Sequence, residues 1–386
     1  MNANGATARY CCRHAGDAPT LAKARVEPFE SFAQRWSALA WDALLEIRGA
    51  PSPFLTLDWL ETWIAHFAPE EARVWTVGPA GNPEAICFTN LEIRRYGPLA
   101  LRTLRACRNS HSQRAALLVA MATEDSARAL FRGLVETRHE WNILRLDGVP
   151  TAQGLADRLV DAAATLGCVA QIDRRFAHVR VPIETDFATF YRAVKRKKRR
   201  DQERMMRRLA DEHGQLTLRA LRGVEAGSVG FEAFLGIERC SWKAFGGEAI
   251  GPDALLRSFY GEIARRFAAR DLLEVDLLVA GGRPIAAGLS LRFGKHLLAL
   301  KTVYDKRFDR FSPGWILYRH VLEQAFGRGL AAVDFYSDLP FARSWSKIVE
   351  PYADLVIFSP TPGGRLLALA KRARDRYHRV RHGAER

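Results

Sequence analysis

A chain of 386 residues, 48% of them hydrophobic and 26% charged, is long enough for two globular cores and too apolar for general disorder. Its six cysteines form no CxxC pair and no zinc-site spacing with histidine, and no segment approaches the ~20 apolar residues of a spanning helix. The first residues also lack the apolar stretch of a secretory signal. We therefore expect reduced thiols, no metal and a cytoplasmic protein.

The net charge of +15 is concentrated in two runs. Residues 195–208 hold nine basic residues, and residues 371–386 hold seven. Such runs favour anionic partners, which include nucleic acid, lipid headgroups and phosphorylated cofactors. The first run has almost no interleaved aromatic residues beyond Tyr191, and no DNA-binding or RNA-binding motif occurs. We therefore expect no DNA partner, and we rank tRNA below a small anionic ligand. The second run follows three leucines, so peripheral contact with an anionic membrane at its inner face stays open beside a solvated tail.

The first half of the chain alternates between helical and strand patterns after a small, polar tail at residues 1–25 that we expect to be disordered. In chain order, the patterns predict helices at 29–47 and 57–67, strands at 74–77, 85–94 and 99–106, a helix at 126–138, a strand at 141–146, a helix at 155–166 and a strand at 168–173.

The second half begins near Val181-Pro182. The patterns predict helices at 187–212, 231–245 and 252–269, strands at 215–221, 272–280, 285–293 and 296–304, a helix from 312, strands at 332–338 and 352–358, and a basic helix after 361. Ser312-Pro313-Gly314 opens the helix that follows the three-strand meander, since Ser is a good N-cap and Pro is favoured at the first helical position. A strand that leads into such a helix N-terminus makes an anion site.

This order of three strands, a helix and a fourth strand resembles the acyl-CoA-binding half of the GNAT acetyltransferase fold. The sequence motifs are most similar to those of the CelD/BcsL-type acetyltransferases, which are related to the FemAB peptidyltransferases. The matching residues are Glu238, Ser241, Trp242, Lys243, Tyr304, Asp305, Ser312, Pro313, Gly314, Leu317, Asp334, Phe335, Asp338, Pro340 and Trp345.

The resemblance implies a mixed α/β fold of two tandem GNAT-like units, because the first half repeats the element order of the second in degenerate form. We therefore divide the chain into a tail at 1–25, a degenerate unit at 26–180, an acetyltransferase unit at 181–360 and a basic tail at 361–386.

The resemblance also implies the cofactor and its site, which are acetyl-CoA or another acyl-CoA held at the turn before the helix. The expected cofactor-binding residues are Arg307, Arg310, Ser312 and Gly314. The turn carries one glycine and a proline without an N–H, so its amide cradle is weaker than a glycine-rich one. The alternative is an ordinary capped helix.

Four residues are expected to be catalytic. Glu238 and Lys243 lie on one predicted helix, and Asp305 and Asp338 lie at the ends of two predicted strands. A carboxylate at any of these places can act as a general base if its pKa is raised toward neutrality. The alternatives are structural roles. Glu238 and Lys243 would then be solvated charges beside a core Trp242, and the two aspartates would be turn or cap residues.

The chain departs from the family where a Gly-Asp pair and Pro-Tyr-Lys are usual, since it reads Ser337-Asp338-Leu339-Pro340-Phe341-Ala342. The missing Tyr hydroxyl has possible substitutes in Ser337, Tyr336 and Tyr352. The resemblance implies acyl transfer from acyl-CoA to an amine by direct attack on the thioester, with an amino sugar or a bacterial surface-polysaccharide precursor as acceptor. The alternatives are a FemAB-like transferase that uses aminoacyl-tRNA, and an inactive GNAT-like scaffold at a membrane surface.

Overall fold

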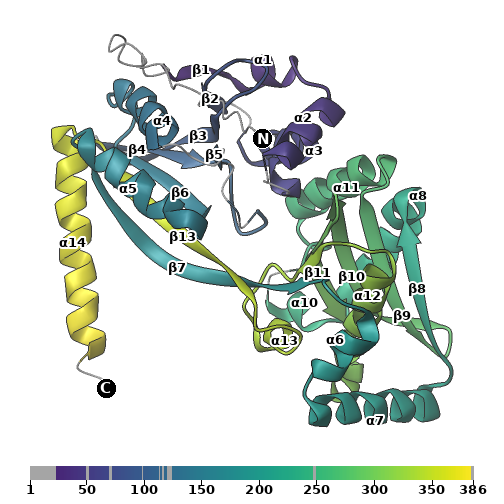
Figure 1. Ribbon diagram of the computed structural model, residues 1–386. Coiled ribbons are helices and arrows are strands. Elements are labelled where there is room, and N and C mark those ends of the chain that lie inside the picture. Colours follow the sequence, from purple (N-terminus) through teal and green to yellow (C-terminus); the bar gives the residue numbers. More distant parts are fainter. Residues whose placement is uncertain are drawn as a thin grey trace, which may run out of the picture.

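The computed structural model describes residues 23–383, except residues 49–51, 69–71, 98, 113, 115–116, 120–123 and 247–248. Within this described part of the chain, thirteen strands form one mixed sheet with helices on both faces (Figure 1). The strand order is β1-β2-β3-β4-β6-β13-β7-β12-β11-β10-β9-β8, and β5 pairs with β3.

The first half of the chain builds one end of the sheet. Its strands are β1 (Arg25–Pro28), β2 (Arg73–Val77), β3 (Ala85–Tyr96), β4 (Leu99–Ala106), β5 (Leu117–Val119), β6 (Ile143–Pro150) and β7 (Val169–Pro182). Its helices are α1 (Phe29–Ala33), α2 (Ala38–Ile47), α3 (Leu57–Phe67), α4 (Glu124–Glu136) and α5 (Leu155–Thr165), with short 3-10 turns η1 (Pro53–Leu55) and η2 (Ala152–Gly154).

The second half builds the other end. Its strands are β8 (Leu216–Arg222), β9 (Leu273–Ala280), β10 (Arg283–Phe293), β11 (His296–Tyr304), β12 (Ala332–Asp334) and β13 (Val349–Phe358). Its helices are α6 (Phe187–Ala193), α7 (Arg196–His213), α8 (Gly223–Glu225), α9 (Phe231–Glu238), α10 (Trp242–Gly246), α11 (Ala254–Ala269), α12 (Pro313–Gly327), α13 (Pro340–Arg343) and α14 (Pro362–Gly383), with a π turn η3 (Ala226–Gly230) and a 3-10 turn η4 (Lys306–Phe311).

The two halves repeat one arrangement, as the sequence predicts. In each half an antiparallel meander (β2-β3-β4 and β9-β10-β11) leads through a helix (α4 and α12) to a strand that pairs in parallel with the last meander strand. The parallel pairs are β4 with β6 and β11 with β12, each over three residues. The fold is therefore mixed α/β with two tandem units.

The final strand of each unit pairs with strands of the other unit. The long strand β7 leaves the first unit and pairs with β12 through residues 180–182, while β13 leaves the second unit and lies between β6 and β7. The units are therefore joined by the backbone hydrogen bonds of one continuous sheet. The sequence predicts β13 as a strand but carries no local signal for its position.

The largest apolar core is shared between the units. Trp59 of α3 packs edge-on against Phe259 of α11, with ring centroids 5.4 Å apart. On the same interface, Arg270 after α11 donates to Asp58 and Asp42 of the first unit, at 2.6 and 2.5 Å. The interface therefore has both a buried aromatic contact and an ionic clamp.

Two predicted helices are each divided into two in the structure. The helix expected at 187–212 is broken at Val194 and Lys195, whose extended backbone separates α6 from α7. The helix expected at 231–245 ends at Glu238, because the Ser241 hydroxyl and amide both bond the Glu238 carbonyl, at 2.7 and 3.0 Å. The single helix predicted for Glu238, Trp242 and Lys243 is therefore wrong.

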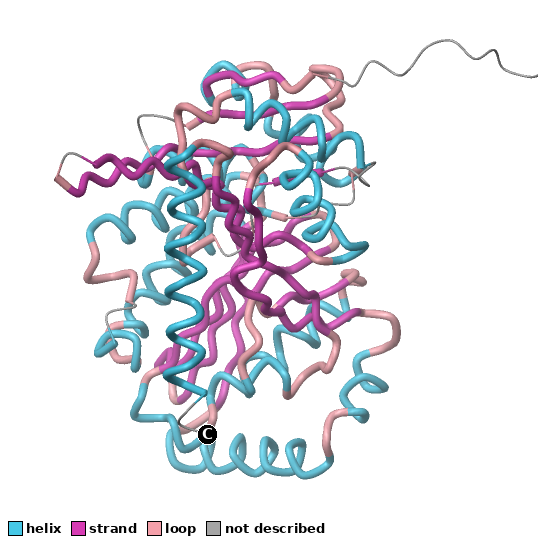
Figure 2. The backbone as a smooth tube through the Cα atoms, turned by 90° about the vertical axis from the view of Figure 1, so that its left-hand side faces the viewer, coloured by secondary structure: helices cyan, strands magenta, loops and turns pink. Residues whose placement is uncertain are grey.

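The C-terminal helix α14 lies on the outer edge of the molecule (Figure 1) and runs as one straight element in front of the sheet (Figure 2). Of the helices in the described residues, none combines the length and the hydropathy that crossing a bilayer requires. Of the tail predicted at 1–25, residues 1–22 lie outside the described residues, and Arg25 already belongs to β1.

Candidate functional site

The strands β11 and β12 separate after a short stretch of parallel pairing. Residues 296–298 pair with residues 332–334, and β12 then ends, while β11 continues to Tyr304. Among the described strands, none pairs with residues 299–304 on that side. We call this stretch the open edge. Its backbone donors and acceptors can pair with an extended ligand.

Two local features hold the strands apart. Leu300 is an extra residue opposite β10, since Leu289 pairs with Lys301 and Ser290 pairs with Ala299, and such a bulge bends a strand. On the other side, the chain after β12 follows β7, because the Phe335 amide donates to Val179 O at 3.0 Å.

Tyr336 takes the chain away from β11. Its φ of 54° is a left-handed conformation that a bulky residue rarely adopts, and its amide donates to Asp334 Oδ1 at 2.8 Å. Its ring stacks on Phe54, with centroids 4.9 Å apart. The side chain of Asp334 and the packing of Tyr336 thus fix the point of separation.

A polar cluster lies beside the open edge and consists of His111, Glu238, Tyr260, Lys301 and Tyr336. His111 Nδ1 lies 3.1 Å from the Tyr260 hydroxyl, and Lys301 Nζ of the open edge lies 5.5 Å from the Tyr260 ring centroid. Among the described residues, Glu238 Oε1 and the Tyr336 hydroxyl are buried without a hydrogen-bond partner. Unsatisfied buried polar atoms are rare and mark a place where a ligand can bind.

Burial sets the protonation of this cluster. Burial, helped by the Lys301 charge, lowers the pKa of His111 to about 4. Burial, with the Glu238 charge, raises the pKa of Tyr260, and burial raises that of Tyr336. At neutral pH the imidazole is therefore neutral and both phenols are protonated. The cluster thus offers proton acceptors and proton donors side by side.

Of these five residues, the sequence predicts Glu238 as catalytic and offers Tyr336 as a possible substitute for the missing tyrosine hydroxyl. The Glu238 carboxylate is buried, and its Oε2 accepts the amides of Ile250 and Gly251 at 2.8 and 3.0 Å. Lys243 lies on the next helix, 5.7 Å from the exposed Trp242 ring. The structure therefore separates the two residues that the sequence places on one helix.

The two predicted aspartates are both paired with arginine. Asp305 caps η4 by accepting the Arg307 amide at 3.0 Å, and it forms ion pairs with Arg283 at 3.1 Å and Arg307 at 2.6 Å. The half-exposed Asp338 pairs with Arg343, which lowers the pKa of that carboxyl. A lowered pKa disfavours a general base at Asp338.

In the predicted anion-binding turn at 309–314, the backbone amides that would bind an anion are partly used in hydrogen bonds within the chain. Ser312 stands at the N-cap position of α12 in a left-handed conformation, and its side chain makes no capping bond. Its carbonyl accepts the amides of Trp315 and Ile316, at 2.9 and 3.4 Å. Gly314 sits in the first turn, and Arg310 pairs with Glu212 of α7. Side chains, more than backbone amides, must therefore bind any anion here.

Those side chains come from α7, which carries the first basic run. Lys198 Nζ lies 5.5 Å from the Trp315 ring, and Arg208 lies 5.8 Å from the Phe311 ring. Gln202 donates to Trp315 O at 2.9 Å, which fixes α7 against the first turn of α12. The sequence shows both the basic run and the turn, but only the tertiary structure brings them together.

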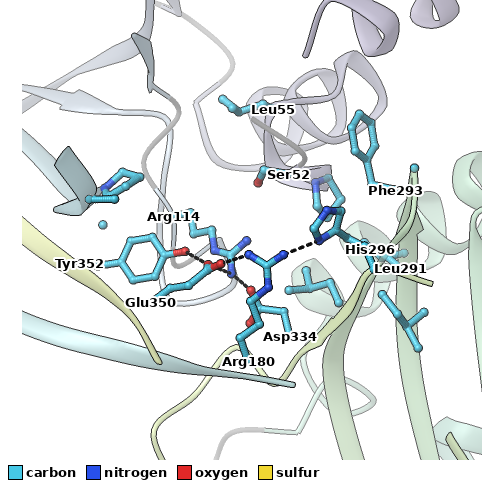
Figure 3. A pocket seen from close by; sticks show the side chains of 18 of the residues that line it. Ser52, Leu55, Arg114, Arg180, Leu291, Phe293, His296, Asp334, Glu350 and Tyr352 are labelled. Carbon is cyan, nitrogen blue, oxygen red and sulfur yellow. Dashed lines mark hydrogen bonds and ion pairs between the residues drawn. The ribbon is translucent and has the colours of Figure 1, made fainter. Parts of the chain in front are cut away.

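A cavity of about 990 Å³ lies between the two units, next to the point where β11 and β12 separate (Figure 3). Both units line it, with Ser52 and Leu55 from the first and Leu291, Phe293 and His296 from the second. It lies on the same face of β11 as the polar cluster, because Leu291 and Phe293 share an apolar core with Tyr260 and Tyr336.

The cavity wall carries a charged network (Figure 3). Arg180 pairs with Glu350, which also accepts the Tyr352 hydroxyl at 3.0 Å, and Arg180 Nη2 lies 3.4 Å from His296 Nδ1. Burial alone would raise the pKa of Glu350, but the charges of Arg114 and Arg180 outweigh it and the pKa is lowered. The wall is therefore ionised at neutral pH and suited to a polar ligand.

Arg114 and Asp334 connect this network to the open edge. Arg114 of the first unit pairs with Asp334, the last residue of β12, and its guanidinium lies 5.3 Å from the Tyr352 ring. Because Asp334 pairs with Leu298 at the end of the parallel ladder, the cavity reaches the point where the open edge begins. No local pattern marks Arg114, and only its partner Asp334 appears in the sequence motif.

Comparison with known proteins finds a family match over most of the second unit. Residues 174–341 match the family described as the acetyltransferase (GNAT) domain. No curated protein matches the chain in sequence.

Solved structures share the overall fold. The crystal structure of FemX matches with a TM-score of 0.58 at 12% identity, covering 86% of this chain and 98% of that chain. A conserved protein of unknown function from Bacteroides thetaiotaomicron VPI-5482 matches with a TM-score of 0.51 at 13% identity, covering 84% and 98%. A tandem GNAT protein from the clavulanic acid biosynthesis pathway has a TM-score of 0.45 at 15% identity, covering 88% and 99%.

Residues 174–341 therefore match a GNAT acetyltransferase domain, and the prediction of an acyltransferase is confirmed. The resemblance to the narrower CelD/BcsL type stays a prediction.

Proposed function

We propose that the chain transfers an acyl group from acyl-CoA, with acetyl-CoA the expected donor, to an amine by direct attack on the thioester. The observation that carries this proposal is the open edge of β11 with the polar cluster beside it. A slot between two strands fits a long, thin arm, and the cluster supplies the groups that a proton transfer at its end requires.

The residues present fit the donor in two places. The pantetheine arm carries two amides, which can pair with the unpaired backbone of residues 299–304 as a strand would. The diphosphate would lie at the start of α12, beside Ser312 and Gly314 and between Arg307 and Arg310. Lys198 and Arg208 of α7 lie over the neighbouring Trp315 and Phe311 rings and add positive charge there. This second fit rests on side-chain charge, since the helix amides are largely bonded already.

The donor supplies an acyl group already activated as a thioester. In the transfer, an N–C bond forms and the C–S bond breaks, while one proton leaves the amine and another reaches the sulfur. We assign the amine proton to Glu238, whose Oε1 is buried without a described partner. The Tyr260 and Tyr336 hydroxyls are placed to give one, and the Lys301 ammonium stabilises negative charge on the acyl oxygen.

We place the acceptor in the cavity between the units. Its volume of about 990 Å³ suits a molecule of sugar size or larger, and its ionised wall suits a polar one. An amino sugar or a polysaccharide precursor, the acceptor implied by the CelD/BcsL resemblance, meets both conditions. Asp334 and Glu350 can hold an ammonium group near the separation point.

The test combines ligand binding with turnover. Acetyl-CoA is expected to raise the melting temperature of the full chain, and thiol release is expected with an amino-sugar acceptor. Lys301→Met is expected to reduce turnover at least 100-fold, whereas Lys347→Met, an exposed lysine outside the site, keeps it. Absence of any shift with a panel of acyl-CoAs, together with absence of thiol release, would refute the proposal.

A second candidate is aminoacyl transfer from aminoacyl-tRNA, the activity that the FemAB resemblance implies. The observation that favours it is the exposed basic surface of α7, which packs against the turn that follows the open edge and the start of α12. This candidate predicts tRNA binding that weakens steeply with salt and no response to acyl-CoA. An Arg310→Ala variant adds a check, because it loses acyl-CoA affinity only if Arg310 binds the diphosphate.

A further inference from the structure

The C-terminal helix α14 stands apart from the catalytic fold. It touches the sheet through Leu367 and Ala368, which pack on Val356 and Phe358 of β13. Lys371 adds an ion pair with Asp173 of β7 at 2.5 Å. These contacts use one side of the helix, which lies at the outer edge of the molecule in Figure 1 and in front of the sheet in Figure 2.

The other side of α14 is apolar and exposed. Leu366, Leu369 and Tyr377 are 68%, 61% and 61% exposed, and Ala370 and Ala373 between them are exposed as well. With 3.6 residues per turn, these five positions fall within roughly one third of the helix circumference. We call them the outer stripe. An apolar stripe on the outside of a helix contributes nothing to folding and indicates a partner.

Basic residues border the outer stripe. Arg365, Arg372 and Arg376 follow one side of it, and Arg374 follows the other, all of them exposed. The helix as a whole carries seven basic residues against one acidic residue, Asp375. A helix with an exposed apolar stripe flanked by arginines has the composition of a helix that lies in a lipid interface.

We propose that α14 lies on an anionic phospholipid bilayer, with the outer stripe among the acyl chains and its arginines on lipid phosphates. Charge decides between this occupant and a second copy of the chain. Two α14 helices packed stripe to stripe would bring their arginine rows together without acidic partners, whereas an anionic lipid surface neutralises each row. The inference is independent of the acyl-transfer proposal, since α14 contributes no residue to the open edge or the cavity.

Vesicle flotation of the full chain tests the inference. Binding is expected to vesicles of phosphatidylcholine with phosphatidylglycerol, and not to phosphatidylcholine alone. Replacing Arg372 and Arg376 by Gln is expected to weaken partitioning about 30-fold, since each arginine near an anionic surface contributes about fivefold. Replacing Leu366 and Leu369 by Ser is expected to weaken it at least tenfold.

The matched control removes the same charge elsewhere. Arg94 and Arg95, exposed on β3, are replaced together by Gln, and partitioning is expected to stay within twofold of wild type. Circular dichroism and melting temperature establish that every variant is folded. Equal binding by the α14 variants and the wild type would overturn the inference, as would an equal loss in the β3 control. A dimer by light scattering that the leucine variant dissociates would overturn it too, because a second copy would then cover the stripe.

Discussion

His178 makes the junction between the units sensitive to acid. It lies on β7, the strand that joins both units, and is only 2% exposed. Its ring packs 5.0 Å from Tyr336 and 4.8 Å from Tyr352, and its Nδ1 has no hydrogen-bond partner among the described residues. Burial, together with the charge of Arg114, lowers the pKa of His178 to about 3.

The direction of the effect follows from which state binds the proton. The unfolded chain takes up a proton near pH 6.5, whereas the folded chain resists it until about pH 3. The free energy of unfolding therefore has its full value above pH 6.5 and decreases as the pH falls below 6.5. At pH 5, about 1.5 units below the pKa of the unfolded histidine, protonation stabilises the unfolded state by about 2 kcal/mol.

The measurement is urea unfolding at pH 8 and pH 5 for the wild type and His178→Phe. Phe keeps the ring packing and removes the titrating nitrogen, so we expect the wild type to lose about 2 kcal/mol more than the variant between the two pH values. All other titrating groups are shared and cancel in this difference. His139→Phe, whose side chain is 76% exposed, is the control and is expected to follow the wild type. Equal losses in wild type and His178→Phe would refute the reasoning.

Two further predictions concern the interface and the polar cluster. Arg270→Met leaves Asp42 without its cation and leaves Asp58 with Arg266 alone, 3.7 Å away, and is expected to cost about 3 kcal/mol in urea unfolding. Arg265→Met, at an exposed surface pair, is expected to cost less than about 1 kcal/mol, and a small effect at Arg270 would show that the clamp is dispensable. Glu238→Gln is expected to keep the melting temperature, because an amide oxygen can accept the same two backbone N–H groups, while turnover falls by at least about 100-fold; unchanged turnover would remove Glu238 as proton acceptor.

The regular elements of both units were largely predictable because their signals are local. The strand at 296–304 and the helix at 57–67 have the predicted bounds, since alternation and 3.6-residue spacing depend on neighbouring residues. The errors have local causes that the apolar pattern does not register. The Ser241 hydroxyl ends α9, and the extended Val194 ends α6, although both segments contain good helix formers.

The site was predictable in smaller part. Glu238 and the turn at 312–314 follow from the motif order, and the structure places both beside β11 or its continuation. His111, Tyr260 and Lys301 come from three distant segments and match no spacing rule, so only the folded chain shows that they meet.

The sequence by itself determined the order of the elements, their two-fold repetition and the chemistry of the turn before α12, since each depends on residues that are neighbours in the chain. Tertiary structure alone decided that β7 and β13 change units and that β12 leaves β11 after three residues. Strand pairing joins residues that are more than 200 positions apart in the chain, and its register is set by which edges remain unpaired when both units have folded. The open edge is such an outcome, and it is the feature from which the function was inferred.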